Sequence, residues 1–136
     1  MTQNRTNARI LVVDDDRLVR SALKRAFLAE GWQVECASTG REALDLIAGD
    51  SSFNVVVADY FMPHINGLEF LSQVNRSYPH IYCVMLTAYP YCTAIKHRLN
   101  KTTHAVLLDK PWDERLLHTI TDALEVQRQA GEARLA

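Results

Sequence analysis

The stretch that decides the fold is residues 53–63, which read FNVVVADYFMP. Its apolar run is short and rich in β-branched residues, which is typical of a strand buried on both faces of a sheet. The run ends at Asp59, and Pro63 soon afterwards favours a turn. We therefore expect a carboxylate at the mouth of a buried strand, where it forms an exposed nucleophile on a rigid base.

Three other apolar runs lead into polar residues in the same manner. The residues that follow them are the Asp14–Asp15 pair, Thr87 and Lys110. Each run precedes a stretch long enough for a helix, which is typical of repeated strand–helix units and a parallel sheet covered on both faces. Because ligands bind at the C-terminal strand ends of such sheets, we expect these polar residues to meet at one edge.

The chain is expected to form one domain over residues 8–126, flanked by polar segments at 1–7 and 127–136. The expected strands lie near 9–14, 32–37, 53–59, 81–87 and 105–110. Gly31 is expected to end the first helix, and residues 39–48 to form the second. The segment 127–136 is a candidate linker to a further domain.

The last two expected helices differ in how many apolar residues anchor them. Ile95 and Leu99 are the only firm apolar anchors of the helix expected after Pro90, so this element is expected to be the least firmly docked. The last helix has five apolar residues at helical spacing, Leu116, Leu117, Ile120, Ala123 and Leu124. Beyond Glu125 the sequence turns polar, and the helix is expected to fray.

Composition excludes several classes of protein. A chain of 136 residues with 48% hydrophobic content suits one domain with a sizeable core. The net charge of -1 and the scattered basic residues argue against nucleic acid as a direct partner. No apolar stretch approaches the roughly 20 residues of a membrane span, and the N-terminus lacks the apolar core of a secretory signal. We therefore expect a cytoplasmic protein with no membrane partner.

The cysteines and histidines give no sign of a metal site. Cys36, Cys83 and Cys92 are odd in number and lack metal-ligand spacing, so we interpret them as reduced thiols with a packing role. The five histidines share no metal-binding pattern and are expected in loops or at the surface.

The acidic residues at the strand ends do indicate a cation. Asp14, Asp15 and Asp59 would repel one another by about 4 kcal/mol per pair at 4 Å and an effective dielectric of 20. Lys110 supplies one positive charge, and an all-oxygen site with room for water suits Mg²⁺ rather than Zn²⁺. Asp59 could then attack phosphorus, while Thr87 and Lys110 bind the other phosphoryl oxygens.

These residues resemble a known family. Val12–Asp15, Asp59–Pro63, Gly67–Glu69, Thr87–Ala88 and Lys110–Pro111 look like the motifs of the response-regulator receiver domain of two-component signalling, in order and across nearly the whole chain. The resemblance implies a flavodoxin-like α/β fold, a five-stranded parallel sheet of order 2-1-3-4-5. It implies Asp59 as phosphoacceptor, with Thr87 as switch hydroxyl and Lys110 as phosphate-binding lysine. Mg²⁺ would be organised by Asp14 and Asp15 together with Asp59 and the backbone carbonyl of Phe61.

The resemblance also implies a signalling role. The donor would be a histidine kinase or a histidine phosphotransfer protein, and the product an aspartyl phosphate, so the chain would act as a switch and not as a turnover enzyme. The surface around strands 4 and 5 would signal to an output domain, an effector or, after phosphorylation, a second copy in a homodimer.

The sequence departs from the family pattern near this surface. Leu107 occupies a place where the family often has an aromatic switch residue, and His104–Ala105 replaces a small Gly-Ala pair. We therefore expect the segment from Tyr89 to His104 to move as a unit, and Trp112 to pack against this face.

Other interpretations are open. Asp16 is expected to cap the first helix, and in the alternative interpretation Asp14 and Asp15 also serve only to cap this helix. A haloacid-dehalogenase-like phosphotransferase also uses a strand-end Asp, but Phe61 occupies the position of its second Asp. An FMN carrier would need a phosphate-binding loop rich in Ser, Thr and Gly after the first strand, and this sequence has none there. A receiver-like interaction module that works without phosphate would fit better if Asp15, Asp59 or Lys110 were missing.

Overall fold

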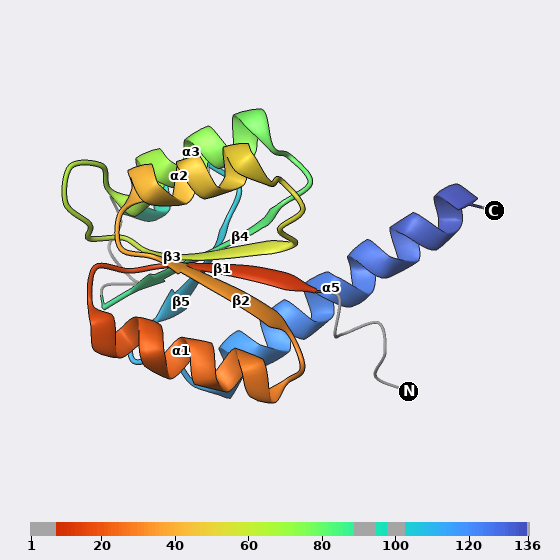
Figure 1. The fold of residues 1–136 in the computed structure, drawn as a ribbon, viewed down its shortest axis with the longest axis horizontal. Helices are drawn as coiled ribbons and strands as arrows, with labels where there is room; N and C mark the ends of the chain where they lie inside the picture. Colours follow the sequence, from red (N-terminus) through yellow and green to blue (C-terminus); the bar gives the residue numbers. More distant parts are fainter. Residues whose placement is uncertain (1–7, 89–94, 98–102, 136) are drawn as a thin grey trace.

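The computed structural model of the chain describes residues 8–88, 95–97 and 103–135. Its strands are β1 (Arg9–Val13), β2 (Gln33–Ala37), β3 (Val55–Asp59), β4 (Tyr82–Thr87) and β5 (Val106–Asp109). They form one parallel sheet of order β2-β1-β3-β4-β5. Helices α2 (Gly40–Gly49) and α3 (Gly67–Ser77) cover one face, and α1 (Arg17–Ala29) and α5 (Glu114–Leu135) cover the other (Figure 1). The predicted doubly covered sheet and its strand order are confirmed.

The sheet separates two apolar cores, and β3 lies at its centre. Every residue of β3 is buried, as the unbroken apolar run predicts. Successive side chains point to opposite faces, so Val56 packs with α2 and α3 while Val55 and Val57 pack with α1 and α5. This double burial fixes the strand that ends at Asp59.

Three helices begin at side chains that accept an amide hydrogen bond. Asp16, Thr39 and Asn66 are the N-caps of α1, α2 and α3, and their side chains accept from Leu18, Glu42 and Glu69. Gly31 adopts a φ of 88° just after α1, so the predicted end of this helix is confirmed. The cap at Asp16 is also confirmed, and it leaves Asp14 and Asp15 available for another role.

The prediction that the chain frays beyond Glu125 is wrong. Helix α5 continues to Leu135 and projects past the sheet (Figure 1). Arg128 forms ion pairs within the helix with Glu125 and Glu132. Gln127 binds the body of the domain, donating to the carbonyl of Asn54 at 3.1 Å. Local ion pairs and the hydrogen bonds of Gln127 therefore maintain the part of α5 beyond Glu125, which has little apolar periodicity.

The expected helix after Pro90 lies mostly outside the described residues. Residues 95–97 are helical, and the predicted anchor Ile95 is buried. Tyr89, Cys92 and Leu99 fall outside the described ranges. Of the helices that the structure describes, none has the length and apolar content that crossing a membrane requires.

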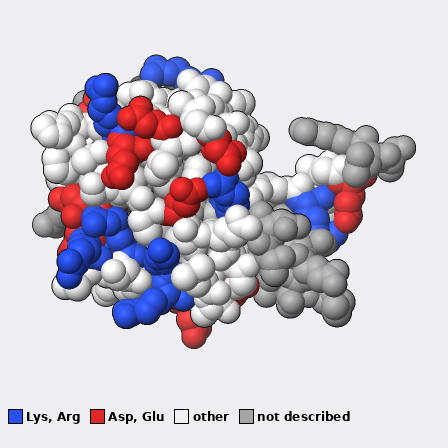
Figure 2. Space-filling model, viewed as in Figure 1, with Lys and Arg blue, Asp and Glu red and all other residues white. Residues whose placement is uncertain are grey.

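Basic side chains are less scattered than the sequence suggested. Figure 2 shows Lys and Arg gathered over α1, at the lower left of the view. This helix carries Arg17, Arg20, Lys24 and Arg25 and no acidic residue. The remaining charges of the visible face are mixed in sign.

Candidate functional site

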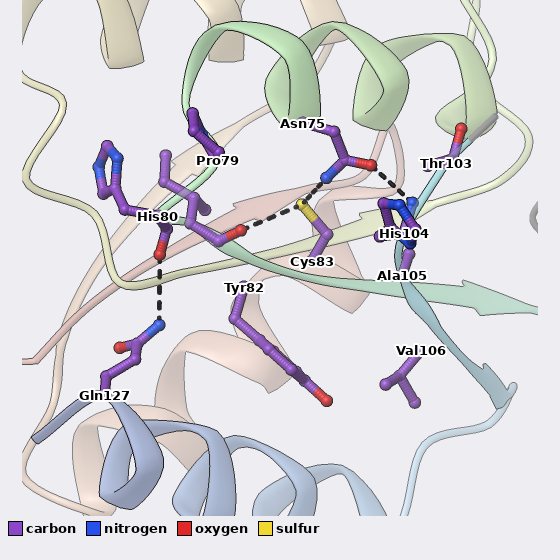
Figure 3. Close-up of a pocket in the computed structure, with 11 residues that line it drawn as sticks. Asn75, Pro79, His80, Tyr82, Cys83, Thr103, His104, Ala105, Val106 and Gln127 are labelled. Carbon is purple, nitrogen blue, oxygen red and sulfur yellow. Dashed lines mark hydrogen bonds between the residues drawn. The ribbon is translucent and has the colours of Figure 1, made fainter. Parts of the chain in front are cut away.

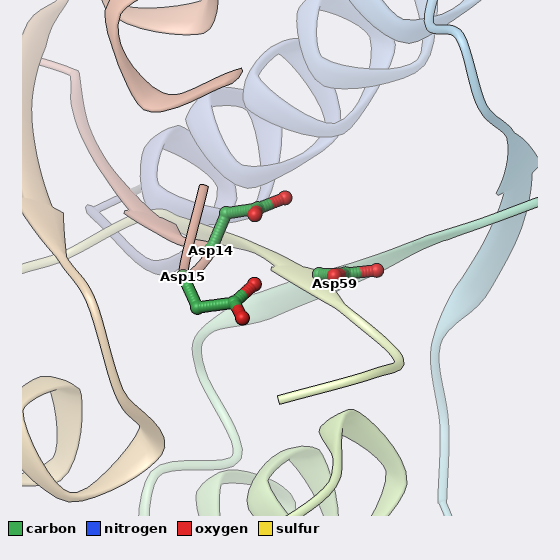
Figure 4. Close-up of side chains that lie close together, drawn as sticks. All are labelled: Asp14, Asp15 and Asp59. Carbon is green, nitrogen blue, oxygen red and sulfur yellow. The ribbon is translucent and has the colours of Figure 1, made fainter. Parts of the chain in front are cut away.

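The C-terminal ends of the strands bring the predicted site residues together. Asp14 and Asp15 follow β1, and Asp59 ends the neighbouring strand β3. One carboxylate oxygen from each of the three lies within 4.8 Å of those of the others. Figure 4 shows these side chains grouped at the same edge of the sheet. The predicted acidic cluster is therefore present.

Lys110 joins this cluster from the far edge of the sheet. Its Nζ lies 3.1 Å from Asp14 Oδ2 and 3.2 Å from Asp59 Oδ1. Its backbone amide donates to the carbonyl of Thr87 at 2.9 Å, which fixes the lysine beside the end of β4. Burial lowers the pKa of Lys110, but its hydrogen bond to Asp14 and the charges of Asp14 and Asp59 outweigh burial and raise this pKa above its ordinary value. The ammonium is therefore charged at neutral pH.

Asp14 is held by contacts that the sequence did not indicate. Its carboxylate is 2% exposed and accepts the amide of Asp16 at 2.9 Å. Its carbonyl accepts from Arg20 Nη1 at 2.8 Å. Arg20 is therefore a positioning residue for the loop, and nothing in its sequence context distinguishes it from the other basic residues of α1. Asp15 is exposed, so this carboxylate reaches solvent.

Asp59 is less exposed than predicted. The residue is 7% exposed, not an open carboxylate. Burial raises its pKa above the ordinary value, and the charge of Asp14 raises it further. Lys110 and the backbone amide of Phe61 oppose this by stabilising the charged form. The surroundings of Asp59 therefore disfavour its negative charge, and this favours binding of a cation or of a group that removes the charge.

Gly67 allows the loop after Asp59 to close tightly. A Cβ at this position would lie 2.3 Å from the carbonyl oxygen of Asp59 and 2.9 Å from Tyr60 Cα. Real side chains do not tolerate such contacts, so only glycine fits. The Gly67 amide also donates to the Tyr60 carbonyl at 2.7 Å. The sequence predicted a turn here, but not that the first residue of α3 packs directly on the backbone of Asp59.

The remaining predicted residues lie at or just after the ends of β3, β4 and β5. Thr87 is fully buried at the end of β4, where it pairs in register with Asp109. Phe61 is 56% exposed and makes an edge contact with Tyr60 at a centroid distance of 4.8 Å. Trp112 is half-buried against the core shared with α1 and α5. The part of the Phe61 carbonyl in metal binding and the roles of Thr87 and Lys110 toward phosphate stay predictions.

The donor set fits Mg²⁺. Three carboxylates supply hard oxygen ligands at spacings that a small inward movement would bring into one coordination sphere, and exposed Asp15 leaves room for water ligands. The cluster holds three negative charges and one ammonium, so its net charge attracts a divalent cation. Cysteine and histidine, which zinc prefers, contribute nothing to the cluster among the described residues.

Comparison with known proteins agrees with this geometry. The family model for the response regulator receiver domain matches residues 10–122. Response regulator MprA of Mycolicibacterium vanbaalenii is 49% identical over 80 residues, which cover 59% of this chain and 34% of that protein. The match thus spans about a third of the length of this curated relative.

Solved structures agree as well. Chemotaxis protein CheY4 of Vibrio cholerae is 30% identical with a TM-score of 0.78, over 85% of this chain and 98% of that one. A CheY-like response regulator receiver domain protein of Methanospirillum hungatei is 28% identical with a TM-score of 0.82, over 90% of this chain and 98% of that one. The chain belongs to the response regulator receiver domain family, the signalling module of two-component systems, with the flavodoxin-like fold that the sequence predicted.

Proposed function

We propose that this chain accepts a phosphoryl group on Asp59 in the presence of Mg²⁺. The observation that carries the proposal is the convergence of three carboxylates on one ammonium at the C-terminal edge of the sheet. Asp59 is the member at the end of the central strand, and its charge is the one that burial and Asp14 disfavour. Conversion of the Asp59 carboxylate to an acyl phosphate moves the negative charge onto the phosphoryl oxygens, which Thr87 and Lys110 can bind.

The proposed donor is a phosphohistidine of a histidine kinase or a histidine phosphotransfer protein. A carboxylate oxygen of Asp59 attacks phosphorus, and a P–O bond forms as the P–N bond breaks. The imidazole leaves with the bonding electron pair and keeps a proton at its other nitrogen. Thr87 and Lys110 then hold phosphoryl oxygens, which stabilises the charge that develops during transfer.

Asp14, Asp15, Asp59 and the Phe61 carbonyl would hold the Mg²⁺ ion. When bound, the ion neutralises carboxylate charge and shields the incoming anion from the nucleophile. Arg20 and the amide of Asp16 keep Asp14 in place for this role. Lys110, which contacts both buried carboxylates, must turn partly toward the phosphoryl group after transfer.

The change in the signalling surface is proposed to follow from the movement of Lys110. Thr87 and Lys110 are joined by a backbone hydrogen bond of 2.9 Å, so a phosphoryl group that draws both inward acts on the ends of β4 and β5 together. The surface around these strands would then bind an output domain or an effector. Leu107 lies half-buried on β5 and has no aromatic ring, so the switch is not expected to use the rotation of an aromatic side chain at that position.

Two alternatives are disfavoured by particular residues. A haloacid-dehalogenase-like phosphotransferase needs an acid two positions after Asp59, and Phe61 has no acidic group. A phosphate-independent interaction module would not need the ammonium that Lys110 places on Asp14 and Asp59.

Intact-mass measurement after incubation with acetyl phosphate tests the proposal. One phosphoryl adduct is expected with Mg²⁺ and none with a chelator. Asp59→Asn should abolish the adduct, and the matched control Asp16→Asn, which keeps a capping side chain on α1, should retain it. Equal labelling of the Asp59→Asn chain would refute the assignment.

A further inference from the structure

The junction between β2 and α2 touches both halves of the acidic cluster. We call residues 37–42, where β2 ends and α2 begins, the β2–α2 junction. On one side the carbonyl of Ala37 accepts the backbone amide of Asp14 at 3.2 Å. On the other side Gly40 packs against Ile65, which lies in the loop between β3 and α3. β2 and β3 are not neighbours in the sheet, so the start of α2 makes a contact that strand pairing does not provide.

The β2–α2 junction is held firmly on the side of β1. Thr39 caps α2 by accepting the amide of Glu42 at 3.1 Å, and the Glu42 carboxylate accepts the amide of Ser38 at 2.7 Å. Each side chain therefore satisfies a backbone amide that the start of the helix leaves free. Ala37 is buried and pairs in register with Val13 of β1. The junction is thus fixed to the strand that leads into the acidic pair.

Gly40 leaves no space between the junction and the loop. A Cβ at Gly40 would lie 2.6 Å from Ile65 Cγ2 and 3.5 Å from Phe70 Cδ1. Cγ2 is attached to the branched Cβ of Ile65, so it can retreat only through a change in χ1 or a shift of the loop backbone. Phe70 is fully buried, so it offers little room on its side. The position of Gly40 therefore sets how closely the loop approaches the junction.

The loop between β3 and α3 is tightly turned. The amide of Ile65 donates to the carbonyl of Pro63 at 2.8 Å, and His64 between them has a φ of 72°. A three-residue turn with positive φ at its centre is rare and strained for a residue other than glycine. Strained backbone persists only where the surrounding packing holds it. Tyr60, Met62 and Ile65 supply that packing, because their side chains lie against the core shared with α2 and α3.

We propose that the β2–α2 junction braces the metal site, with Gly40 as a positioning residue that acts through Ile65. The inference rests on the proposed Mg²⁺ site, whose ligands Asp14 and the Phe61 carbonyl follow different strands. The junction holds the amide of Asp14 directly and the backbone around Phe61 through Ile65. Mg²⁺ demands near-ideal octahedral geometry, so a brace that fixes the separation of the two halves reduces the rearrangement that binding requires.

Calorimetry of Mg²⁺ binding to the whole chain tests the proposal. Gly40→Ala is expected to raise the Kd for Mg²⁺ about tenfold, because the loss of a residue that orients a metal ligand has an effect of this size. Gly49→Ala adds the same methyl group at the other end of α2, where a Cβ would meet nothing within 4 Å. This control should leave the Kd unchanged within about twofold.

A double-mutant cycle isolates the route through Ile65. If the Cβ of Gly40→Ala acts by displacing Ile65, the same substitution should change the Kd by less than about twofold when Ile65→Ala is already present. An equal loss of affinity in both backgrounds would overturn the proposal.

Gln127→Ala separates a loss of stability from a loss of positioning. The amide nitrogen of Gln127 donates to the carbonyls of Asn54 at 3.1 Å and His80 at 3.5 Å. These contacts lie at the N-terminal ends of the strands, at the opposite end of the sheet from the acidic cluster (Figure 3). The variant should therefore lower the midpoint of thermal unfolding and leave the Kd for Mg²⁺ unchanged within about twofold. A Kd raised as much as in Gly40→Ala would overturn the proposal.

His64 provides a variant that leaves the core intact. Its side chain is exposed, so a substitution there acts on the backbone turn. His64→Val places a β-branched residue at positive φ, which sterics strongly disfavour, and should raise the Kd for Mg²⁺ several-fold. His64→Asn should not, because asparagine tolerates this conformation. Equal affinities of the two variants would contradict a role for the turn.

The wild-type chain distinguishes failure of the inference from failure of the proposed function. A wild-type chain that binds no Mg²⁺ would overturn the proposed function and this inference with it. A wild-type chain that binds Mg²⁺ no more tightly than Gly40→Ala does would overturn the inference alone.

Discussion

Asp59→Asn is expected to stabilise the protein when no metal is bound. The wild-type carboxylate faces Asp14 and Asp15 with oxygens within 4.8 Å, and it faces Lys110 at 3.2 Å. At an effective dielectric of 20, each carboxylate pair costs about 3.5 kcal/mol and the lysine contact returns about 5 kcal/mol. Burial of the charge and repulsion from the carboxylates, Asp14 above all, together therefore exceed the attraction to Lys110, and removing the charge should raise the free energy of unfolding by about 1–2 kcal/mol. For a domain of this size the midpoint of thermal unfolding should rise by about 3–8 °C.

The pH dependence of this gain follows from the direction of the pKa shift. The pKa of Asp59 is raised in the folded state, by burial and then by Asp14, so the protonated carboxyl is the form that folding favours. Its contribution to stability is fully present below the unfolded pKa, near 4, and is lost as pH rises through the folded pKa. The advantage of Asp59→Asn over the wild type should thus be small near pH 4 and should grow to a plateau at neutral pH.

Thermal unfolding in low salt with a chelator, at several pH values, measures the effect. Asp45→Asn removes a charge from an exposed position on α2 and should change stability by no more than about 0.5 kcal/mol. Adding Mg²⁺ should stabilise the wild type more than Asp59→Asn, because the ion then offsets the repulsion. A variant that is less stable than the wild type at neutral pH without metal would refute the reasoning, since Lys110 would then outweigh both the burial of Asp59 and the neighbouring carboxylates.

Three further outcomes are expected. Gly67→Ala should lower both stability and the rate of labelling by acetyl phosphate, because its Cβ would meet the Asp59 carbonyl at 2.3 Å; unchanged labelling would show that the loop can shift at no cost. Lys110→Ala should leave Mg²⁺ affinity in calorimetry intact or raise it, because a competing cation is gone, and a clear loss of affinity would contradict this. Burial raises the pKa of Cys83 to about 12, so iodoacetamide at pH 8 should modify half-exposed Cys36 in the native protein and spare Cys83, as peptide mass analysis would show.

The sequence predicted the sheet well because each strand is specified locally. Every residue of β3 is apolar up to Asp59, and such runs have few alternatives to a buried parallel strand. The polar residues that end β1, β3, β4 and β5 then converge for a topological reason, since parallel strands end at one edge. The acidic cluster could therefore be predicted without any side-chain geometry.

The features that sequence missed depend on contacts between distant segments. Helix α5 persists past Glu125 through Gln127, whose partner Asn54 is 73 residues away, although the spacing of Glu125, Arg128 and Glu132 did carry a helical signal. The burial of Asp59 depends on how closely the surrounding loops pack, and a one-dimensional pattern does not report that distance.

Chemical mapping of the phosphorylated residue tests the central claim most directly. The chain is labelled with acetyl phosphate and Mg²⁺ and reduced with borohydride, which converts an aspartyl phosphate to homoserine, and its peptides are then analysed by mass spectrometry. The account predicts homoserine at position 59 alone, and none when Mg²⁺ is omitted. Homoserine at position 14 or 15, or labelling that is independent of Mg²⁺, would contradict it.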